Sequence, residues 1–236
     1  NLSGATAAYV TPSHHFPLGS IMPIKRRLEL LSWAAAGENR YIIEDDYDSE
    51  FRYKGKPVPS LQGIDTNEKV IYLGTFSKAV APSIRMSYMV LPKPLLDIYK
   101  KKLSFYSSTV ARTEQKQMCE FIRRGHFERH LNRMRNIYKS KRDYILQQLA
   151  PYSDRIDISG ETSGLHMLLT FKDGRNAKQI LKTARQHNLI LFDLSDYYVD
   201  PANMTMKNTV ILGYGALTDS QLKIQMPMLI QALFET

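Results

Sequence analysis

The fold is decided by the stretch Val70-Ile71-Tyr72-Leu73-Gly74-Thr75-Phe76-Ser77-Lys78, in which an apolar run ends on hydroxyl groups and a lysine. Val70–Leu73 predicts a short buried strand, because the run is apolar, rich in β-branched and aromatic residues, and followed by a glycine. A second apolar run, Tyr41–Glu44, precedes it along the chain and predicts another strand. Short apolar strands separated by helical patterns indicate a mainly parallel sheet and therefore the α/β class.

The remaining expected elements extend from these two strands in both directions. Further strands are expected at Ala7–Val10, Tyr88–Leu91, Arg155–Ile158, Leu165–Phe171, Leu189–Asp193 and Thr209–Tyr214. Helices are expected at Pro23–Ala36, from Ala111 to about Leu149 with a break at Gly125, at Ala177–His187 and at Asp219–Phe234. The pattern changes beyond Pro151, so we expect residues 1–135 to form one domain and residues 136–236 a smaller α/β domain.

Composition and charge narrow the class of protein. The chain has 236 residues, is 43% hydrophobic and contains no apolar run long enough to cross a bilayer. Its single cysteine, Cys119, predicts neither an internal disulfide nor a metal cluster, and we expect a cytoplasmic protein. Asn1–Gly4 has no initiator methionine and no secretory pattern, so we expect part of a longer protein. The net charge of +9 suits an anionic partner such as DNA, or else reflects solvated helix faces.

Polar side chains follow the expected strands at the points where they end. Asp45 and Tyr47 follow the Tyr41–Glu44 run, Lys78 follows the next strand, and Arg85 follows the loop after it. Ligands of open α/β sheets bind at the carboxyl ends of the strands. An amine nucleophile, a carboxylate for a ring nitrogen, and hydroxyl and guanidinium donors for a phosphate are what pyridoxal phosphate requires. Each residue alone is more typical of a turn or a solvated position, so the order and spacing carry the prediction.

The lysine segment resembles that of a known family. Thr75-Phe76-Ser77-Lys78 and the following Ala81-Pro82-Ser83-Ile84-Arg85-Met86 are similar to the corresponding segments of class I/II aminotransferases, which are fold-type I enzymes that depend on pyridoxal phosphate. The resemblance implies a mainly parallel large domain, of which this chain holds the C-terminal part, and a small α/β C-terminal domain. It also implies roles for particular residues: Lys78 as the Schiff-base lysine, Asp45 at the pyridine nitrogen, Tyr47 at the phenolic oxygen, and Thr75, Ser77 and Arg85 at the phosphate.

Two longer segments resemble one branch of regulators. Tyr9–Gly19 and Ile43–Tyr53 are similar to the MocR/GabR-type regulators of the GntR family. This resemblance implies a bacterial transcription regulator in which an N-terminal winged helix-turn-helix, missing here, binds DNA. It further implies that the aminotransferase-like domain forms an aldimine with pyridoxal phosphate, responds to an amino compound or to the cofactor itself, and assembles as a homodimer.

Two departures distinguish this chain from a working aminotransferase of the family. Phe16-Pro17-Leu18-Gly19 places a phenylalanine where catalytic members have the asparagine of Asn-Pro-x-Gly, so that His14 or His15 would have to supply the missing hydrogen-bond donor. Asn208–Tyr214, a late strand of the expected small domain, lacks the arginine that binds a substrate carboxylate.

Three functions are therefore weighed. The first is an effector-sensing domain of a transcription regulator, with at most a partial transamination half-reaction and with His14 and His15 in the effector loop. The second is an active aminotransferase in which Lys78 is the general base. The third is a DNA-binding module in its own right, for which the charge is the only motivation.

Overall fold

A computed structural model describes residues 4–55, 58–200 and 204–235 of the chain. It divides into two compact units. The first unit comprises Asn1–His15, Ser20–Glu50 and Gly55–Met134, and the second comprises Phe16–Gly19, Phe51–Lys54 and Arg135–Thr236. Two short segments from the first part of the sequence thus belong to the second unit. No sequence pattern predicted this. The expected assignment of residues 1–135 and 136–236 to a large and a small domain stays a prediction.

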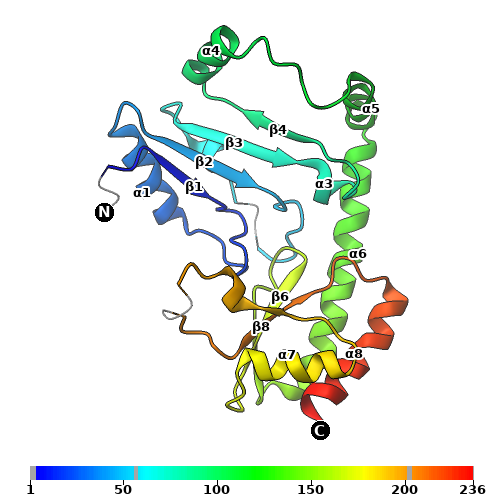
Figure 1. The fold of residues 1–236 in the computed structure, drawn as a ribbon. Coiled ribbons are helices and arrows are strands. Elements are labelled where there is room, and N and C mark those ends of the chain that lie inside the picture. The colour runs from blue at the N-terminus through cyan, green and yellow to red at the C-terminus, as the bar shows by residue number, and fades with distance from the viewer. Residues whose placement is uncertain (1–3, 56–57, 201–203, 236) are drawn as a thin grey trace. The chain divides into compact units, whose positions relative to one another are not determined.

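The first unit is built on a four-stranded sheet. Its strands are β1 (Ala7–Val10), β2 (Tyr41–Asp46), β3 (Val70–Thr75) and β4 (Ser87–Val90), in the order β1-β2-β3-β4 (Figure 1). β1, β2 and β3 are parallel, whereas β4 runs antiparallel to β3. The carboxyl ends of β2 and β3 therefore lie at one edge of the sheet, as the sequence predicted.

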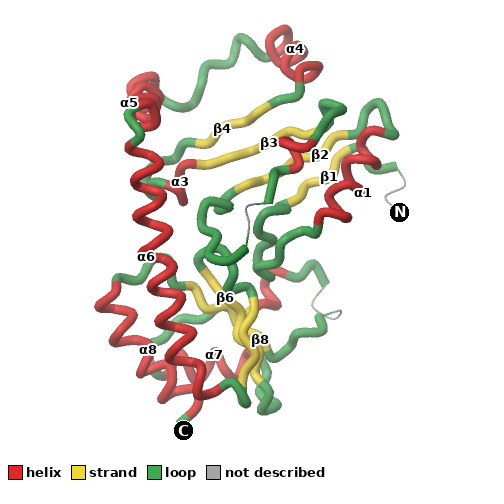
Figure 2. Tube along the Cα trace, turned by 180° about the vertical axis from the view of Figure 1, so that it is seen from behind, coloured by secondary structure: helices red, strands yellow, loops and turns green. Residues whose placement is uncertain are grey.

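A small apolar core holds helix α1 (Ile24–Ala35) against this sheet. Leu31 and Ala34 of the helix pack with Ile42 of β2, Val70 of β3 and Leu61. Leu61 begins the short helix α2 (Leu61–Ile64). The tube view from behind shows α1 beside β1 and β2 (Figure 2).

A fully buried arginine joins the loops around α1. Arg27 has no exposed surface, and its guanidinium donates hydrogen bonds to three backbone carbonyl groups. The acceptors are Pro12 O at 2.6 Å, Pro59 O at 2.7 Å and Met22 O at 3.0 Å. A buried charge is stable only when its donors are satisfied, so this arrangement determines where the loop after β1 runs.

Three further helices complete the first unit and lead out of it. α3 (Phe76–Ala79) follows β3, α4 (Lys93–Lys102) follows β4, and α5 (Arg112–Arg123) comes next. Gly125, at a φ of 68°, separates α5 from α6 (His126–Leu149), which confirms the expected break. α6 belongs to the first unit up to Met134 and to the second from Arg135.

The second unit contains an antiparallel sheet. Its strands are β5 (Ile156–Ser159), β6 (His166–Phe171), β7 (Phe192–Asp193) and β8 (Thr209–Gly213), in the order β5-β6-β8-β7. The short 3₁₀ helices Ala150–Tyr152 and Leu194–Tyr197 precede β5 and follow β7. α7 (Ala177–Gln186) and α8 (Asp219–Phe234) each begin with a capping box, on Asn176 and Thr218.

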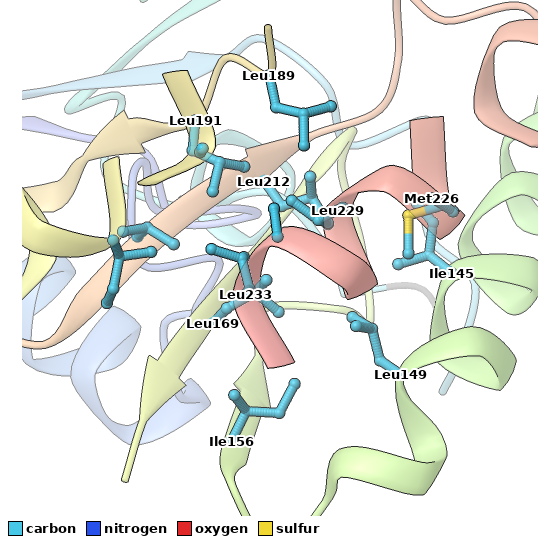
Figure 3. Packing of buried hydrophobic residues seen from close by; sticks show 14 of the residues in the cluster. Ile145, Leu149, Ile156, Leu169, Leu189, Leu191, Leu212, Met226, Leu229 and Leu233 are labelled. Carbon is cyan, nitrogen blue, oxygen red and sulfur yellow. The ribbon is translucent and has the colours of Figure 1, made fainter. Parts of the chain in front are cut away.

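The main core of the second unit lies between this sheet and its helices. Leu169 of β6 and Leu212 of β8 pack against Leu229 and Leu233 of α8 (Figure 3). The C-terminal half of α6 contributes to the same cluster through Ile145, which is fully buried. A smaller cluster on the other side of the sheet contains Leu168, Leu194, Met204 and Ile211.

The expected elements differ from the observed ones mainly at their ends. β2 and β3 continue two residues further than predicted, because the ladder pairs Asp45 with Leu73 and Asp46 with Gly74. The strand expected at Leu189–Asp193 is reduced to Phe192–Asp193, since only these two residues pair with β8. Pairing of this kind depends on the neighbouring strand, which a single-strand pattern does not reveal.

Within residues 4–55, 58–200 and 204–235, no helix combines the length and the apolar character that crossing a membrane requires.

Replacing Arg27 tests whether this buried guanidinium holds the loops together. Arg27→Ala should lower the free energy of unfolding by about 3–5 kcal/mol, because three carbonyl groups each lose a hydrogen bond from the guanidinium and a cavity remains. Arg26→Ala is the matched control, since Arg26 is exposed and forms an exposed ion pair with Glu29, for a loss of about 0.5 kcal/mol. Urea denaturation measures both variants. Equal losses would contradict the role given to Arg27.

Candidate functional site

The candidate site lies where β2 and β3 end. Because these strands are parallel and adjacent, the acidic loop after β2 and the lysine segment after β3 emerge at the same edge of the sheet. Gly74 leaves room there for the Tyr88 ring, because a Cβ atom at this position would lie 2.3 Å from Cζ of Tyr88. Apart from Phe16 and the residues that it contacts, the site residues discussed next belong to the first unit.

Lys78 lies on α3, directly after the end of β3. The helix begins at Phe76 and is capped by Thr75, whose Oγ1 accepts a hydrogen bond from the Ser77 backbone N–H at 3.2 Å. Lys78 Nζ lies 4.4 Å from the centroid of the Tyr47 ring, and the lysine is exposed. The Lys78 amine, after β3, thus lies close to the Tyr47 ring, after β2. The sequence led us to expect these two residues in a common site.

Tyr47 is held as a neutral phenol. Burial raises its pKa well above the ordinary value, and the charges of Asp48, Asp45 and Asp46 raise it further. Its hydroxyl oxygen lies 3.1 Å from Nδ1 of His14. Tyr47 therefore keeps its proton at any pH at which the protein works, and it can donate a hydrogen bond.

Asp45 ends β2 beside Tyr9 of β1. The Tyr9 hydroxyl donates a short hydrogen bond to Oδ2 of Asp45, and this bond raises the pKa of Tyr9 to about 12. Tyr9 is 61% exposed, so its ring does not seal the carboxylate from solvent. Sequence reasoning missed Tyr9, although its position next to β2 follows from the strand order.

Thr75 and Ser77 hold the loop that carries Arg85. Ser77 Oγ donates to Ile84 O at 2.6 Å, and Thr75 Oγ1 donates to Met86 O at 3.4 Å. Arg85 itself is exposed and lines a cavity of about 520 Å³ together with residues of the same loop and of α5. The described lining of this cavity includes Glu114 but not Lys78.

The two adjacent histidines occupy different environments. His14 is 1% exposed, and its Nδ1 lies 2.8 Å from Oδ2 and 2.9 Å from Oδ1 of Asp48. His15 is exposed, and its Nδ1 lies 3.1 Å from Oγ1 of Thr11. Asp48 was not singled out from the sequence, because its role depends on a contact across 34 positions.

Phe16, the residue at the expected asparagine position, belongs to the second unit. Its ring makes edge contacts with His166 and Tyr197, at centroid distances of 5.3 Å and 4.8 Å. β8 supplies no arginine, as its sequence requires. No group of three or more histidine, cysteine, aspartate or glutamate side chains in the described part of the chain could hold a metal ion.

Comparison with known proteins identifies the family. The model of the family "Aminotransferase class I and II" matches residues 4–222, and the chain belongs to this family. Among solved structures, the kynurenine aminotransferase of Pyrococcus horikoshii is similar at 26% identity and a TM-score of 0.81, over 98% of this chain and 56% of that one. The expected α/β, fold-type I architecture is confirmed.

Several of the curated relatives are transcription regulators. The uncharacterized HTH-type transcriptional regulator YhdI of Bacillus subtilis is 41% identical over 92% of this chain and 45% of its own length. The probable rhizopine catabolism regulatory protein MocR of Rhizobium meliloti is 32% identical over 89% of this chain and 42% of its own length. The resemblance to MocR-type regulators is thus confirmed, and the chain spans about half the length of these relatives.

Proposed function

We propose that this chain is the effector-sensing, pyridoxal-phosphate-binding part of a MocR-type transcription regulator. The observation that carries the proposal is the position of the Lys78 amine, 4.4 Å from the Tyr47 ring and at the same sheet edge as Asp45. An amine, a neutral phenol and a carboxylate at adjoining strand ends are the groups that this cofactor needs. The regulator relatives supply the second half of the proposal.

The residues present fit the cofactor in their chemistry. When bound, pyridoxal phosphate supplies an aldehyde for the lysine and an electron-withdrawing ring. Lys78 would attach it, Asp45 would face the ring nitrogen, and Tyr47 would donate to the phenolic oxygen. The Tyr9 hydroxyl donates to Oδ2 of Asp45, and the carboxylate can accept a further hydrogen bond from the ring nitrogen.

The phosphate would be held by Thr75, Ser77 and Arg85. Ser77 Oγ donates to Ile84 O, so its hydrogen must turn away from that carbonyl before it can reach a phosphate oxygen. Arg85 is exposed and free to swing on its long side chain. Phosphate binding would thus reorganise the loop from Val80 to Met86, which offers one route from ligand binding to a change in the shape of the first unit.

The choice between sensor and enzyme rests on the second-unit residues and the relatives. Phe16 stands where the family's catalytic members have asparagine and packs on His166 and Tyr197, which leaves that position without a polar side chain. β8 contributes no arginine for a substrate carboxylate. The two regulators named above are 41% and 32% identical, against 26% for the kynurenine aminotransferase. An active aminotransferase remains the alternative.

The partners of the whole protein follow from the same proposal. DNA would be bound by a helix-turn-helix domain, since HTH-type is part of the name of the Bacillus relative. The effector would be an amino compound or the cofactor itself, and the assembly a homodimer. Direct DNA binding by this part of the chain is not favoured, because its sequence carries no helix-turn-helix signature, no zinc-ligand spacing and no RNA-binding aromatic pattern.

Lys78→Ala tests the attachment of the cofactor. The variant should lose all near-ultraviolet and visible absorbance from lysine-bound pyridoxal phosphate. Without the cofactor its unfolding midpoint should stay that of the parent, because Lys78 is exposed. Borohydride reduction followed by peptide mass spectrometry should find the added mass on Lys78 in the parent protein. Lys100→Ala on α4 is the control and should keep both signals. A cofactor mass on another lysine would contradict the assignment.

Turnover distinguishes the sensor from the enzyme. The intact gene product, loaded with pyridoxal phosphate, is mixed with candidate amines and the cofactor absorbance is followed together with binding to its operator DNA. A sensor should respond to one amine with a spectral change that does not exceed one equivalent per site and with altered DNA binding. Sustained multiple turnover when a keto acid is added would instead establish the aminotransferase.

A further inference from the structure

Asp48 and His14 form a buried aspartate–histidine pair that contacts the hydroxyl group of Tyr47. His14 and Asp48 are each 1% exposed, and both carboxylate oxygens of Asp48 lie within 2.9 Å of Nδ1 of His14. The hydroxyl oxygen of Tyr47 lies 3.1 Å from the same nitrogen. Nδ1 of His14 is therefore shared between a carboxylate and the phenol that faces Lys78.

The carboxylate decides which atom carries the proton. An ionised carboxylate can only accept hydrogen bonds, so the close approach of Asp48 requires a hydrogen on Nδ1 of His14. This holds whether the imidazole ring is neutral or protonated, because Nδ1–H is present in both cases. Nδ1 then has no lone pair for the Tyr47 hydroxyl. The Tyr47 hydroxyl oxygen can therefore only accept a hydrogen bond from His14. The hydroxyl hydrogen of Tyr47 must point in another direction.

The position of His14 is determined by contacts that do not involve Tyr47. Met22 N donates to Pro12 O at 2.9 Å, and Arg27 donates to the same carbonyl. His15 N donates to Ser20 O at 2.8 Å across the loop. The loop is thus held on both sides of His14, and the histidine can orient Tyr47 rather than follow it.

We propose that Asp48 and His14 are positioning residues which hold Tyr47 as an acceptor on one side and direct its hydrogen to the phenolic oxygen of pyridoxal phosphate bound at Lys78. This inference rests on the proposed function, because it concerns the same cofactor site. Tyr47 keeps its hydrogen to donate, since its pKa lies well above the ordinary value.

The expected effect is on the proton affinity of the lysine–cofactor linkage. The proton of the lysine–cofactor linkage is shared with the phenolic oxygen of the cofactor. A hydrogen-bond donor to this oxygen competes with that proton, so it lowers the pKa of the linkage. In Asp48→Asn the side chain facing His14 is an amide, which can donate a hydrogen bond as well as accept one. Nδ1 of His14 then no longer has to carry a hydrogen, and the proton of the imidazole ring can reside on Nε2. Nδ1 then accepts from Tyr47, the phenol turns away from the cofactor, and the pKa of the linkage rises.

The charges that face Tyr47 must be separated from this hydrogen-bond effect. Asp45, Asp46 and Asp48 all act on the phenol, and Lys78 lies over its ring. Asp46→Asn is the matched control, because it removes one of these charges without touching His14. Asp46 is instead bonded to Ser49 Oγ at 2.7 Å and to the Tyr72 hydroxyl at 2.6 Å.

The test is a pH titration of the cofactor absorbance in the protein loaded with pyridoxal phosphate, for the parent, Tyr47→Phe, Asp48→Asn, the double variant and Asp46→Asn. Tyr47→Phe should raise the pKa of the linkage by about one unit or more, and Asp48→Asn should raise it by a comparable amount. The double variant should show no further rise, because both changes remove the same hydrogen bond. Asp46→Asn should shift it by well under half as much.

The outcomes separate the inference from the proposed function. If the parent shows no lysine-bound cofactor, the proposed function fails. If the parent binds the cofactor but Asp48→Asn titrates as the parent does, or adds fully to Tyr47→Phe, the positioning role is wrong. Should Asp48→Asn not fold, long-range ¹H–¹⁵N NMR of His14 in the parent decides: a proton on Nδ1 supports the inference, and its absence overturns it.

Discussion

The parallel pairing of β2 with β3 is the constraint on which the site depends. Its register, Asp45 opposite Leu73 and Asp46 opposite Gly74, makes both strands end at one edge of the sheet. Asp45 of the acidic loop and Lys78 of the lysine segment, which are more than 30 positions apart, are brought to this edge by the register alone. A slip of one residue would turn every side chain of β2 to the opposite face, and Glu44 or Asp46 would then stand where Asp45 lies.

Buried polar contacts then determine how the loops run over this edge. Arg27 holds the loop after β1, and Glu44 of β2 accepts hydrogen bonds from the backbone N–H groups of Leu61 and Gln62 at 2.9 Å. These contacts give the His14 loop a definite place beside Tyr47. The functional groups of the first unit are thus positioned by backbone hydrogen bonds of buried charges, and only secondarily by its small apolar core.

The sequence predicted most of the fold because its apolar runs and glycines are local signals. The strands at both ends of the chain, the break at Gly125 and the meeting of Lys78 with the acidic strand end were all expected from such patterns. What it did not predict depends on contacts between distant segments. The pairing of His14 with Asp48 and the bond from Tyr9 to Asp45 span 34 and 36 positions, and neither residue pair has a spacing that marks it.

If the carboxylate at the end of β2 and the amine after β3 serve one ligand, the protonation of the cofactor's ring nitrogen depends on Asp45. Pyridoxal phosphate labelled with ¹⁵N in the ring is bound to the parent protein and to Asp45→Asn, and its nitrogen chemical shift is measured by NMR. We expect a protonated ring nitrogen in the parent and a neutral one in Asp45→Asn, since only an ionised carboxylate stabilises the charged ring. The same shift in both proteins would contradict this expectation.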